Sequence, residues 1–304
     1  KRYLKYLLFF MIISRVLIIK HGSIGDIFMS LDSVRAIQKK YSDITLLSTS
    51  SGHKIFNDLD FKFKKIIDDR RGFFDTYKIL LQIIFQKFDI VIDLQNSQRT
   101  SIYLFILKFF SNSISNGSSL FASKRYQKVN LDEHVKDGLK NQLRILDIQV
   151  DDTINEHHRI IKKQVIIVPG SSKEGSHKRW NIENYNSLMS YLSGKNIHSY
   201  VIGGLDETEL SNLIPKNKFF HNLINKSPWK VVKSIALESI VAISNDTSAM
   251  HYISSLNVPI IALMKNNSYS VRNAPTSKNS IVIAKKNIND ISVEEVKNAL
   301  SRFI

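Results

Sequence analysis

The segment Lys20–Asp26 (KHGSIGD) joins an apolar run to a predicted helix and carries polar residues with chemical potential. Gly22 and Gly25 are three positions apart, which allows a tight turn and close approach of the backbone to a ligand. Asp26 offers a carboxylate for acid–base chemistry beside that turn. Aspartate is also a common cap at the start of a helix, so the residue type leaves a catalytic and a structural role open. The complete G-x-G-x-x-G fingerprint of dinucleotide binding does not occur, which disfavours a nicotinamide enzyme.

Two further segments have the composition of phosphate-binding loops. Pro169–Ser172 (PGSS) follows an apolar run and precedes Lys178, so small residues, hydroxyl groups and a cation come together. Ser244–His251 (SNDTSAMH) lies between a strand and an apolar helix, where backbone N–H groups and the helix dipole suit a diphosphate. His251 falls about one turn into that helix, on the same side as Thr247. A solvated basic loop and a packed histidine are the alternatives that these residue types leave open.

Weaker signals follow other predicted strands. Gly203–Glu207 (GGLDE) places a carboxylate where a ribose could bind, and Asp93 ends a strand with Arg99 shortly after it. His157 and His158 form a pair without carboxylates at metal-ligand spacing, and the chain has no cysteine, so we expect no metal site. The residues of a Ser-His-Asp hydrolase do not occur in a recognisable arrangement.

The elements that must position these residues alternate between strand and helix along the chain. We expect strands at 15–20, 44–48, 63–67, 88–94, 164–168, 198–203, 239–243 and 258–263. We expect helices at 26–40, 73–87, 101–110, 131–146, 182–193, 207–213, 228–236, 248–256 and 293–303. Such alternation is typical of parallel sheets with helices on both faces and ligands at the carboxyl ends of the strands.

A polar stretch at Asp151–Lys163 interrupts the alternation, and the pattern then restarts. We therefore predict an α/β protein with two Rossmann-like, doubly wound domains, 1–155 and 156–304, facing a central cleft. The last helix either stays with the second domain or packs back on the first.

The formal net charge of +16 favours anionic partners such as nucleotide diphosphates, phospholipid surfaces and phosphorylated glycolipids. No recognised nucleic-acid motif accompanies the charge, so we expect no nucleic-acid partner. Residues 1–13 (KRYLKYLLFFMII) put basic residues before an apolar run that is shorter than the ~20 residues needed to span a bilayer. We interpret residues 1–10 as an extension before Met11; the alternative is an interfacial anchor that uses Lys1, Arg2 and Lys5 on lipid phosphates.

Taken together and in this order, the loops resemble those of glycosyltransferase family 9, the ADP-heptose:lipopolysaccharide heptosyltransferases. The matching segments extend over nearly the whole chain from Arg15: Val16–Leu31 (VLIIKHGSIGDIFMSL), Asp93–Arg99, Pro169–Trp180, Gly203–Glu207 and Ser244–His251, with Val258 and Pro259 beyond. The resemblance implies a GT-B architecture, with the acceptor bound by the N-terminal domain and the nucleotide sugar by the C-terminal domain.

The resemblance also implies roles for single residues. Asp26 matches the aspartate of the family that is taken to be the general base. The donor-binding positions of the family are matched by Ser171, Ser172, Lys178, Glu207, Asp246, Thr247, Ser248 and His251. Ser248 stands where the family has glycine; its backbone N–H remains, but its side chain narrows the site. Residues 174–177 lengthen the loop before Lys178, which affects the register of the two serines.

On this basis we expect an inverting, metal-independent glycosyltransferase without a cofactor. It would move a heptose or related sugar from an ADP-sugar to a lipopolysaccharide-core or similar anionic glycolipid. Lys20, Arg35 and Arg99 are the expected acceptor contacts, and the expected location is cytoplasmic, with peripheral association with the inner face of the membrane. The alternative is a non-catalytic protein of the same fold that binds a nucleotide sugar or a glycolipid. The presence of both Asp26 and the donor loop favours the enzyme.

Overall fold

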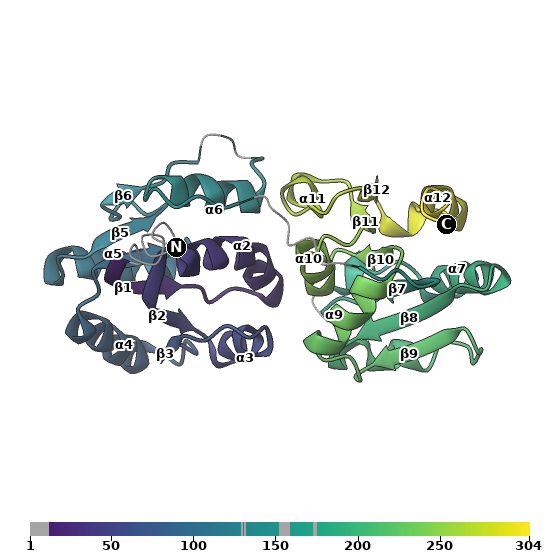
Figure 1. The fold of residues 1–304 in the computed structure, drawn as a ribbon, viewed down its shortest axis with the longest axis horizontal. Coiled ribbons are helices and arrows are strands. Elements are labelled where there is room, and N and C mark those ends of the chain that lie inside the picture. The colour runs from purple at the N-terminus through teal and green to yellow at the C-terminus, as the bar shows by residue number, and fades with distance from the viewer. Residues whose placement is uncertain (1–11, 129, 131, 152–158, 173–174) are drawn as a thin grey trace, which may run out of the picture. The chain divides into compact units, whose positions relative to one another are not determined.

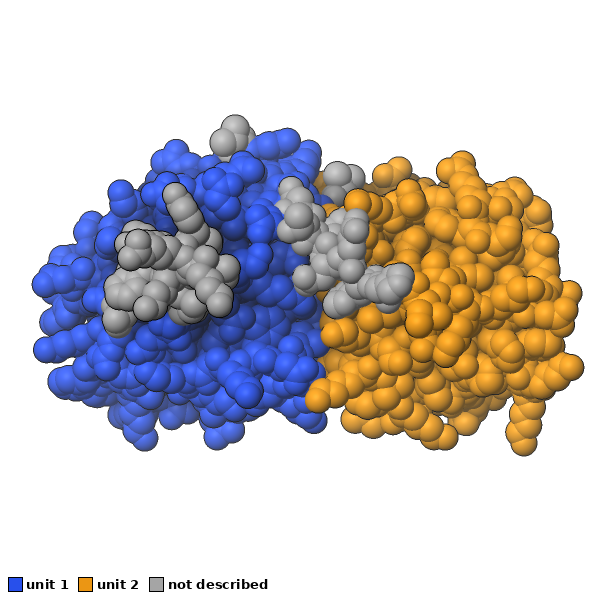
Figure 2. Space-filling view, in the orientation of Figure 1, with its two compact units in different colours: residues 1–152 blue, residues 153–304 orange. Residues whose placement is uncertain are grey.

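The computed structural model describes residues 12–128, 130, 132–151, 159–172 and 175–304. The chain forms two compact units, residues 1–152 and residues 153–304 (Figure 2). Each unit has one six-stranded sheet whose paired strands are all parallel, flanked by helices (Figure 1). The predicted α/β fold of two doubly wound units is therefore confirmed.

The first of the described strands lies in the middle of the first sheet, and the later strands are added on both sides of it. Its strand order is β3 (Lys64–Ile67), β2 (Tyr41–Ser48), β1 (Ile12–Ile19), β4 (Ile90–Asp93), β5 (Ile114–Gly117) and β6 (Lys124–Arg125). Because β1 pairs with both β2 and β4, the winding direction reverses between β1 and β4. In open α/β sheets, ligands bind at the carboxyl ends of the strands beside such a reversal.

Helices cover both faces of the first sheet (Figure 1). They are α2 (Ile24–Lys40), α3 (Ser50–Asp58), α4 (Phe73–Gln86), α5 (Gln98–Phe110) and α6 (Val135–Arg144). Buried residues of α4 and α5 pack with Leu17, Ile19 and Val91 of the central strands in one apolar core. The run 16–19 of β1 is fully buried, as expected for a central parallel strand that is covered on both faces.

The second sheet repeats the same winding. Its strand order is β12 (Ile281–Lys285), β11 (Ile260–Lys265), β10 (Ala242–Asn245), β7 (Gln164–Val168), β8 (His198–Gly203) and β9 (Phe220–Ile224). Its α-helices are α7 (Ile182–Gly194), α8 (Thr208–Ser211), α9 (Trp229–Glu238), α10 (Ser248–Ser255), α11 (Ser268–Arg272) and α12 (Val293–Leu300). Short 3-10 helices are η1 (Ser176–Lys178), η2 (Leu205–Glu207) and η3 (Ile288–Asp290). Here the reversal lies between β7 and β10.

The core of the second unit includes the closing helix. Val296 and Leu300 of α12 are fully buried in the cluster that contains α7 and the strands, so α12 packs within this unit. Trp180 precedes α7, is buried, and donates its indole N–H to the carbonyl of Ile291 at 2.8 Å. This bond links the start of α7 to the segment just before α12.

Several short elements differ from the sequence-based expectations. Helix α3 and the strands β5, β6, β9 and β12 were not predicted, and β10 and β11 begin later than expected. The expectations for residues 1–10 and for His157 and His158 lie outside the described residues. Within the described part of the chain, no helix is both long and apolar enough to cross a bilayer.

Candidate active site

Asp26 lies in the first turn of α2, directly after the carboxyl end of β1. Ser23 is the N-cap, and its backbone N–H and hydroxyl donate to Asp26 Oδ2 at 3.2 Å and 3.1 Å. Asp26 N in turn donates to Ser23 Oγ at 3.4 Å, which completes a capping box. Asp26 thus has the helix-capping role that the sequence left open. Its Oδ2 makes the capping bonds, and its Oδ1 takes no part in them.

Gly22 is required by the geometry of the same turn. Its φ of +37° lies in the left-handed region, and a Cβ at this position would lie 2.9 Å from Asp26 Cβ. Its backbone N–H donates to Gln95 Oε1 at 2.7 Å, which ties the turn after β1 to the segment after β4. The two strand ends that flank the winding reversal are therefore held together beside Asp26.

Lys20 is buried beneath this turn instead of being exposed to a ligand. Only 4% of Lys20 is exposed, and its Nζ donates to the carbonyl of Leu94 at 3.1 Å. Burial lowers the pKa of Lys20, and the nearby charges of Asp26 and Asp93 partly oppose this shift. The structure therefore places Lys20 as an internal link between the ends of β1 and β4.

Arg99 belongs to a buried cluster around Asp68 that the sequence analysis did not find. Arg99 Nε and Nη2 donate to the two oxygens of Asp68 at 3.0 Å and 2.8 Å, and the Tyr103 hydroxyl donates to Asp68 Oδ2 at 2.5 Å. His21 Nε2 lies 2.9 Å from the same Oδ2, in a polar contact that lacks the direction of a hydrogen bond.

The electrostatics of Asp68 follow from these contacts. Asp68 is fully buried, and burial acts to raise the pKa of its carboxyl group. The contacts with His21, Arg99 and Tyr103 together outweigh burial and hold the pKa of Asp68 well below its usual range. Burial and the bond to Asp68 raise the pKa of Tyr103. The cluster joins β1, β3 and α5 at the carboxyl edge of the first sheet.

Arg35 is not brought together with the other predicted acceptor contacts. It lies on α2, about two and a half turns beyond Asp26 at 3.6 residues per turn. Its Nη1 pairs with Asp32 Oδ1 at 3.1 Å, and Lys136 approaches the other oxygen of Asp32 at 3.2 Å.

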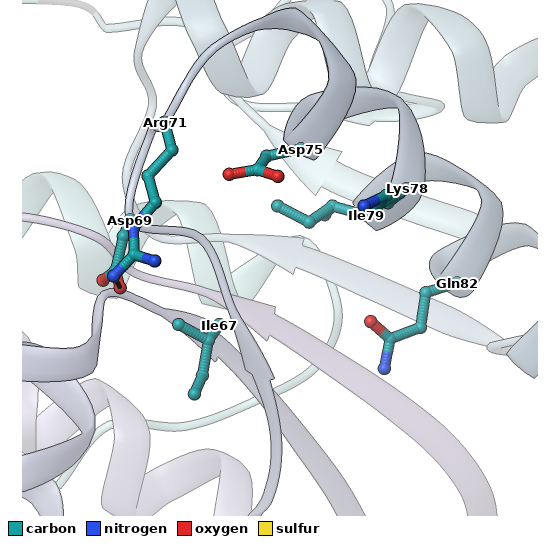
Figure 3. Close-up of a pocket in the computed structure, with 7 residues that line it drawn as sticks. All are labelled: Ile67, Asp69, Arg71, Asp75, Lys78, Ile79 and Gln82. Atoms are coloured by element: carbon teal, nitrogen blue, oxygen red, sulfur yellow. Dashed lines mark hydrogen bonds and ion pairs between the residues drawn. The ribbon is translucent and has the colours of Figure 1, made fainter.

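A polar cavity of about 250 Å³ opens beside the loop that follows β3 (Figure 3). In Figure 3, Asp69 and Arg71 lie on this loop, while Asp75, Lys78 and Gln82 project from α4; Ile67 and Ile79 complete the lining. Arg71 Nη2 lies 3.2 Å from Asp69 Oδ2. This cavity was not predicted, although the run DDRR directly after the predicted strand 63–67 was a usable signal.

In the second unit, Lys178 reaches Asp246 at the carboxyl end of β10. Lys178 Nζ donates to Asp246 Oδ2 at 2.7 Å and lies 4.5 Å from the centroid of the Tyr269 ring. Burial acts to lower the pKa of Lys178, but the contacts with Asp246 and Tyr269 outweigh it and raise the pKa. The side chain is therefore a charged ammonium group at neutral pH.

Asn245 fixes the strand ends on which this pair depends. It is fully buried, its amide donates to the carbonyl of Pro169 at 2.7 Å, and its oxygen accepts from the Tyr185 hydroxyl at 2.9 Å. The carboxyl ends of β7 and β10 and the helix α7 are joined by this one side chain. Asn245 was not among the predicted site residues.

Thr247 caps α10, the helix that follows β10. Its hydroxyl oxygen accepts from the backbone N–H of Ala249 at 3.0 Å. Ser248 is the first residue of the helix, where backbone N–H groups lack partners within the helix and the dipole is positive. His251 is buried one turn later, with Nε2 3.7 Å from Asp246 Oδ1. The structure thus brings together five of the predicted donor residues, 178, 246, 247, 248 and 251, at the start of one helix.

Ser171 and Ser172 bond mainly within their own loop. The Ser171 hydroxyl donates to the carbonyl of Gly175 at 2.7 Å, and Ser172 Oγ accepts from the backbone N–H of Gly175 at 3.3 Å. Arg179 Nη2 donates to the carbonyl of Ser171 at 2.5 Å. Arg179 also donates to the carbonyl of Asp206 at 3.2 Å, so it connects this loop with the loop after β8.

Glu207 is packed against Gly170. A Cβ at position 170 would lie 1.9 Å from Glu207 Cγ and 2.4 Å from Glu207 Oε1, so a larger residue there would displace the Glu207 side chain. Glu207 Oε2 accepts from the backbone N–H of Gly204 at 2.7 Å. Burial raises the pKa of Glu207, while this bond and the charge of Arg179 partly oppose the shift. The carboxylate thus lies next to the loop that begins at Pro169.

Comparisons with known proteins identify the family of the chain through a family model and its fold through solved structures. A family model for glycosyltransferase family 9 (heptosyltransferase) matches residues 77–300. No curated protein sequence matches the chain. Among solved structures, a glycosyltransferase family 9 protein from Veillonella parvula is similar with a TM-score of 0.76 and 18% identity, covering 97% of this chain and 98% of that one.

Two Escherichia coli structures give similar matches. Heptosyltransferase WaaC with ADP has a TM-score of 0.73 and 15% identity, covering 95% of this chain and 100% of that one. ADP-heptose LPS heptosyltransferase II has a TM-score of 0.71 and 17% identity, covering 95% and 98%. At these identities the structures show the fold, while the family model shows the family.

Proposed function

Because the chain belongs to glycosyltransferase family 9, the heptosyltransferase family, we propose that it transfers a heptose or a related sugar from an ADP-sugar to a lipopolysaccharide-core or similar glycolipid, with inversion at the anomeric carbon. The chain is a glycosyltransferase with a GT-B fold. Its donor and acceptor are the part that we propose. The observation that carries the proposal is the charged Lys178 held at 2.7 Å from Asp246 beside the start of α10.

This arrangement suits the diphosphate of an ADP-sugar. The diphosphate gains negative charge as it leaves, and fixed donors aimed at that charge lower the barrier. The backbone N–H group of Ser248 and the ammonium group of Lys178 are such donors, whereas the backbone N–H group of Ala249 already donates to the Thr247 hydroxyl. Asp246 holds Lys178 in place, so the cation is positioned before the donor binds. Because these groups act on the leaving diphosphate, the proposed reaction requires no divalent metal and no cofactor.

The other donor contacts follow from the same loops. The proposed ribose contact is Glu207, which lies against Gly170. Ser171 and Ser172 would hold phosphate oxygens, which requires their hydroxyls to exchange bonds within the loop for bonds to the ligand. WaaC has been solved with ADP and with ADP-2-deoxy-2-fluoro heptose, which supports an ADP-sugar as the donor class.

Asp26 is the proposed general base. The acceptor hydroxyl oxygen forms a bond to the anomeric carbon, the bond from that carbon to the diphosphate breaks, and the hydroxyl proton passes to Asp26. Proton transfer late in a cation-like transition state suits a carboxylate base, because the attacking hydroxyl has become acidic by then. General-base catalysis of this kind contributes ~10²–10⁴-fold.

Two of the expected acceptor contacts, Lys20 and Arg99, are engaged within the protein. Lys20 is buried and Arg99 is engaged with Asp68, so neither presents an exposed cation. The cavity beside α4 offers Arg71 and Lys78 instead, and both side chains are exposed. An anionic, lipid-linked acceptor would meet these cations at the cytoplasmic face of the membrane.

A donor-competition assay tests the proposal. Purified protein is titrated with ADP-heptose, ADP-glucose, UDP-glucose and GDP-mannose, and transfer to a lipopolysaccharide-core acceptor is followed by mass spectrometry. We expect tight binding and transfer with ADP-heptose, and both should persist in excess EDTA. Preference for a uridine or guanosine donor, or binding without any transfer at saturating donor, would refute the proposed reaction.

A further inference from the structure

Helices α4 and α5 carry large apolar side chains on their outward sides. Exposed fractions are 79% for Phe74, 75% for Phe85 and 66% for Phe109. We call the set Phe74, Tyr77 and Phe85 on α4 with Ile102, Phe105 and Phe109 on α5 the α4–α5 aromatic face. All six side chains are more than two-fifths exposed, with Phe105 the least exposed at 41%.

The spacing of these residues shows that they form stripes opposite the core. On α4, residues 74, 77 and 85 recur at helical intervals, while Ile79, Leu80 and Ile83 face the sheet. On α5, residues 102, 105 and 109 do the same, while the core side is 103, 104 and 107. A surface helix normally presents polar residues outward, so helices that are apolar on both sides indicate a second contact surface.

The two stripes belong to one surface. Helices α4 and α5 contact each other and pack on the same face of the first sheet. The Phe105 ring contacts Phe109 at 5.2 Å and Phe121 at 4.8 Å between centroids, which extends the apolar surface to the segment after β5. Leu120 in that segment is also exposed. Contiguous apolar surfaces of this kind mark sites of protein or membrane contact.

Most of the charged residues on α4 and α5 are basic, and the exposed Asp89 beyond α4 accepts from the backbone N–H of Arg15. Lys78, Lys87 and Lys108 are exposed on or at the end of the two helices. The sequences of α4 and α5 contain one acidic residue, Asp75, which is half-buried in the first turn of α4. Aromatic residues surrounded by lysines suit a bilayer that carries anionic lipid headgroups, because the rings enter the interface while the lysines bind phosphates.

Other occupants fit these charges less well. A second copy that used the same face would bring lysines against lysines. The N-terminal residues 1–10 contain Lys1, Arg2 and Lys5 and no acidic residue, so they too would add positive charge. An anionic surface is the partner that the face complements.

We infer that the α4–α5 aromatic face docks the protein on anionic lipid bilayers. The inference rests on the proposed function only in that a lipid-linked acceptor requires access to a membrane. The rings of Phe74, Phe85 and Phe109 insert into the headgroup region, and Lys87 and Lys108 bind lipid phosphates.

Vesicle co-sedimentation of the full chain tests this inference. Vesicles of phosphatidylcholine alone are compared with vesicles that also contain phosphatidylglycerol, across a range of salt concentrations. The wild type should bind only the anionic vesicles, and binding should weaken as salt rises. The triple variant Phe74→Ser/Phe85→Ser/Phe109→Ser should bind at least about 10-fold more weakly. The double variant Lys87→Gln/Lys108→Gln should lose about 5-fold per lysine.

Matched controls separate docking from folding and from catalysis. Ile161→Ser/Leu213→Ser removes exposed apolar side chains of the second unit, and Lys216→Gln/Lys226→Gln removes exposed lysines there; both should bind vesicles like the wild type. Transfer to a detergent-dispersed acceptor should be unchanged in every docking variant, so a failed docking model is distinguishable from a failed reaction model.

Four results would each overturn the inference. They are equal binding of the wild type to neutral and anionic vesicles, wild-type binding by the triple serine variant, and a dimer in sedimentation that this variant dissociates. The fourth is loss of binding in Lys1→Gln/Arg2→Gln/Lys5→Gln while the face variants bind normally, which would assign docking to the N-terminal segment.

Discussion

Gly170→Ala should destabilise the second unit, because the side chain of Glu207 occupies the space that the new methyl group needs. In Gly170→Ala the new methyl group would lie 1.9, 2.4 and 2.5 Å from Cγ, Oε1 and Cδ of Glu207. These distances are far below any van der Waals contact, so the Glu207 side chain must leave its position. Overpacking of this kind costs about 1–3 kcal/mol of the free energy of unfolding. The displaced carboxylate should also lose its proposed ribose contact and weaken ADP-sugar binding.

A double-mutant cycle isolates this contact from other effects. Glu207→Ala removes the atoms that the new methyl group would meet. In that background, the loss of unfolding free energy caused by Gly170→Ala should be smaller by at least about 1 kcal/mol. The chain has two tryptophans, Trp180 and Trp229, and both lie in the second unit. Their fluorescence during urea unfolding therefore reports the unit that carries the substitutions. Additive costs of the two substitutions would refute the packing argument.

Further predictions concern the two charged clusters. Asp68→Asn should destabilise the first unit by about 3–5 kcal/mol, because it leaves Arg99 without its buried partner. The pKa of Asp68 is lowered on folding, so the ionised carboxylate stabilises the fold above the unfolded pKa of ~3.9, and this contribution is lost as pH falls below that value. Urea midpoints of the wild type, measured down to acid pH, test this direction. Equal midpoints of the wild type and Asp68→Asn at neutral pH would contradict the stabilising role of the carboxylate. Lys178→Met should weaken ADP-sugar binding about 10–100-fold in calorimetry, because it removes one charge-assisted contact that is worth about 1.5–3 kcal/mol. Lys226→Met should bind the ADP-sugar like the wild type. Equal affinities of these two variants would remove Lys178 from the donor site.

The central architecture was predictable because its strands are continuous apolar runs. The run 16–19 and the run 165–167 are fully buried strands, and each is followed by a loop with glycine. The outer strands could not be found in this way. Strand β6 (KR) is an edge strand that is short, pairs on one side only and has no apolar residue. Strand β5 (ISNG) pairs with both β4 and β6, but Ile114 is its only large apolar residue. Their positions are set by the sheet and not by their own composition.

The site shows the same division between local and distant determinants. The Ser23–Asp26 cap and the Thr247 cap arise within a few residues of each helix start. The sequence therefore placed Asp26 at the start of a helix, although the N-cap is Ser23 and the helix begins at Ile24. The environments of Arg99 and Lys20 depend on partners more than 30 residues away, Asp68 and Leu94. Their types suggested exposed cations, and only the fold shows that each is engaged internally.

A comparison of turnover in Asp26→Asn and Ser23→Ala decides whether Asp26 is the catalytic base. Both substitutions disturb the same capping box, but only the first removes the carboxylate that is proposed as the base. Loss of the Ser23 cap costs ~1 kcal/mol of stability and should leave turnover within a few-fold of the wild type. Asp26→Asn should lower turnover by ~10²-fold or more while ADP-heptose binding stays unchanged. Near-normal turnover of Asp26→Asn, or equal losses in the two variants, would contradict a catalytic role for Asp26.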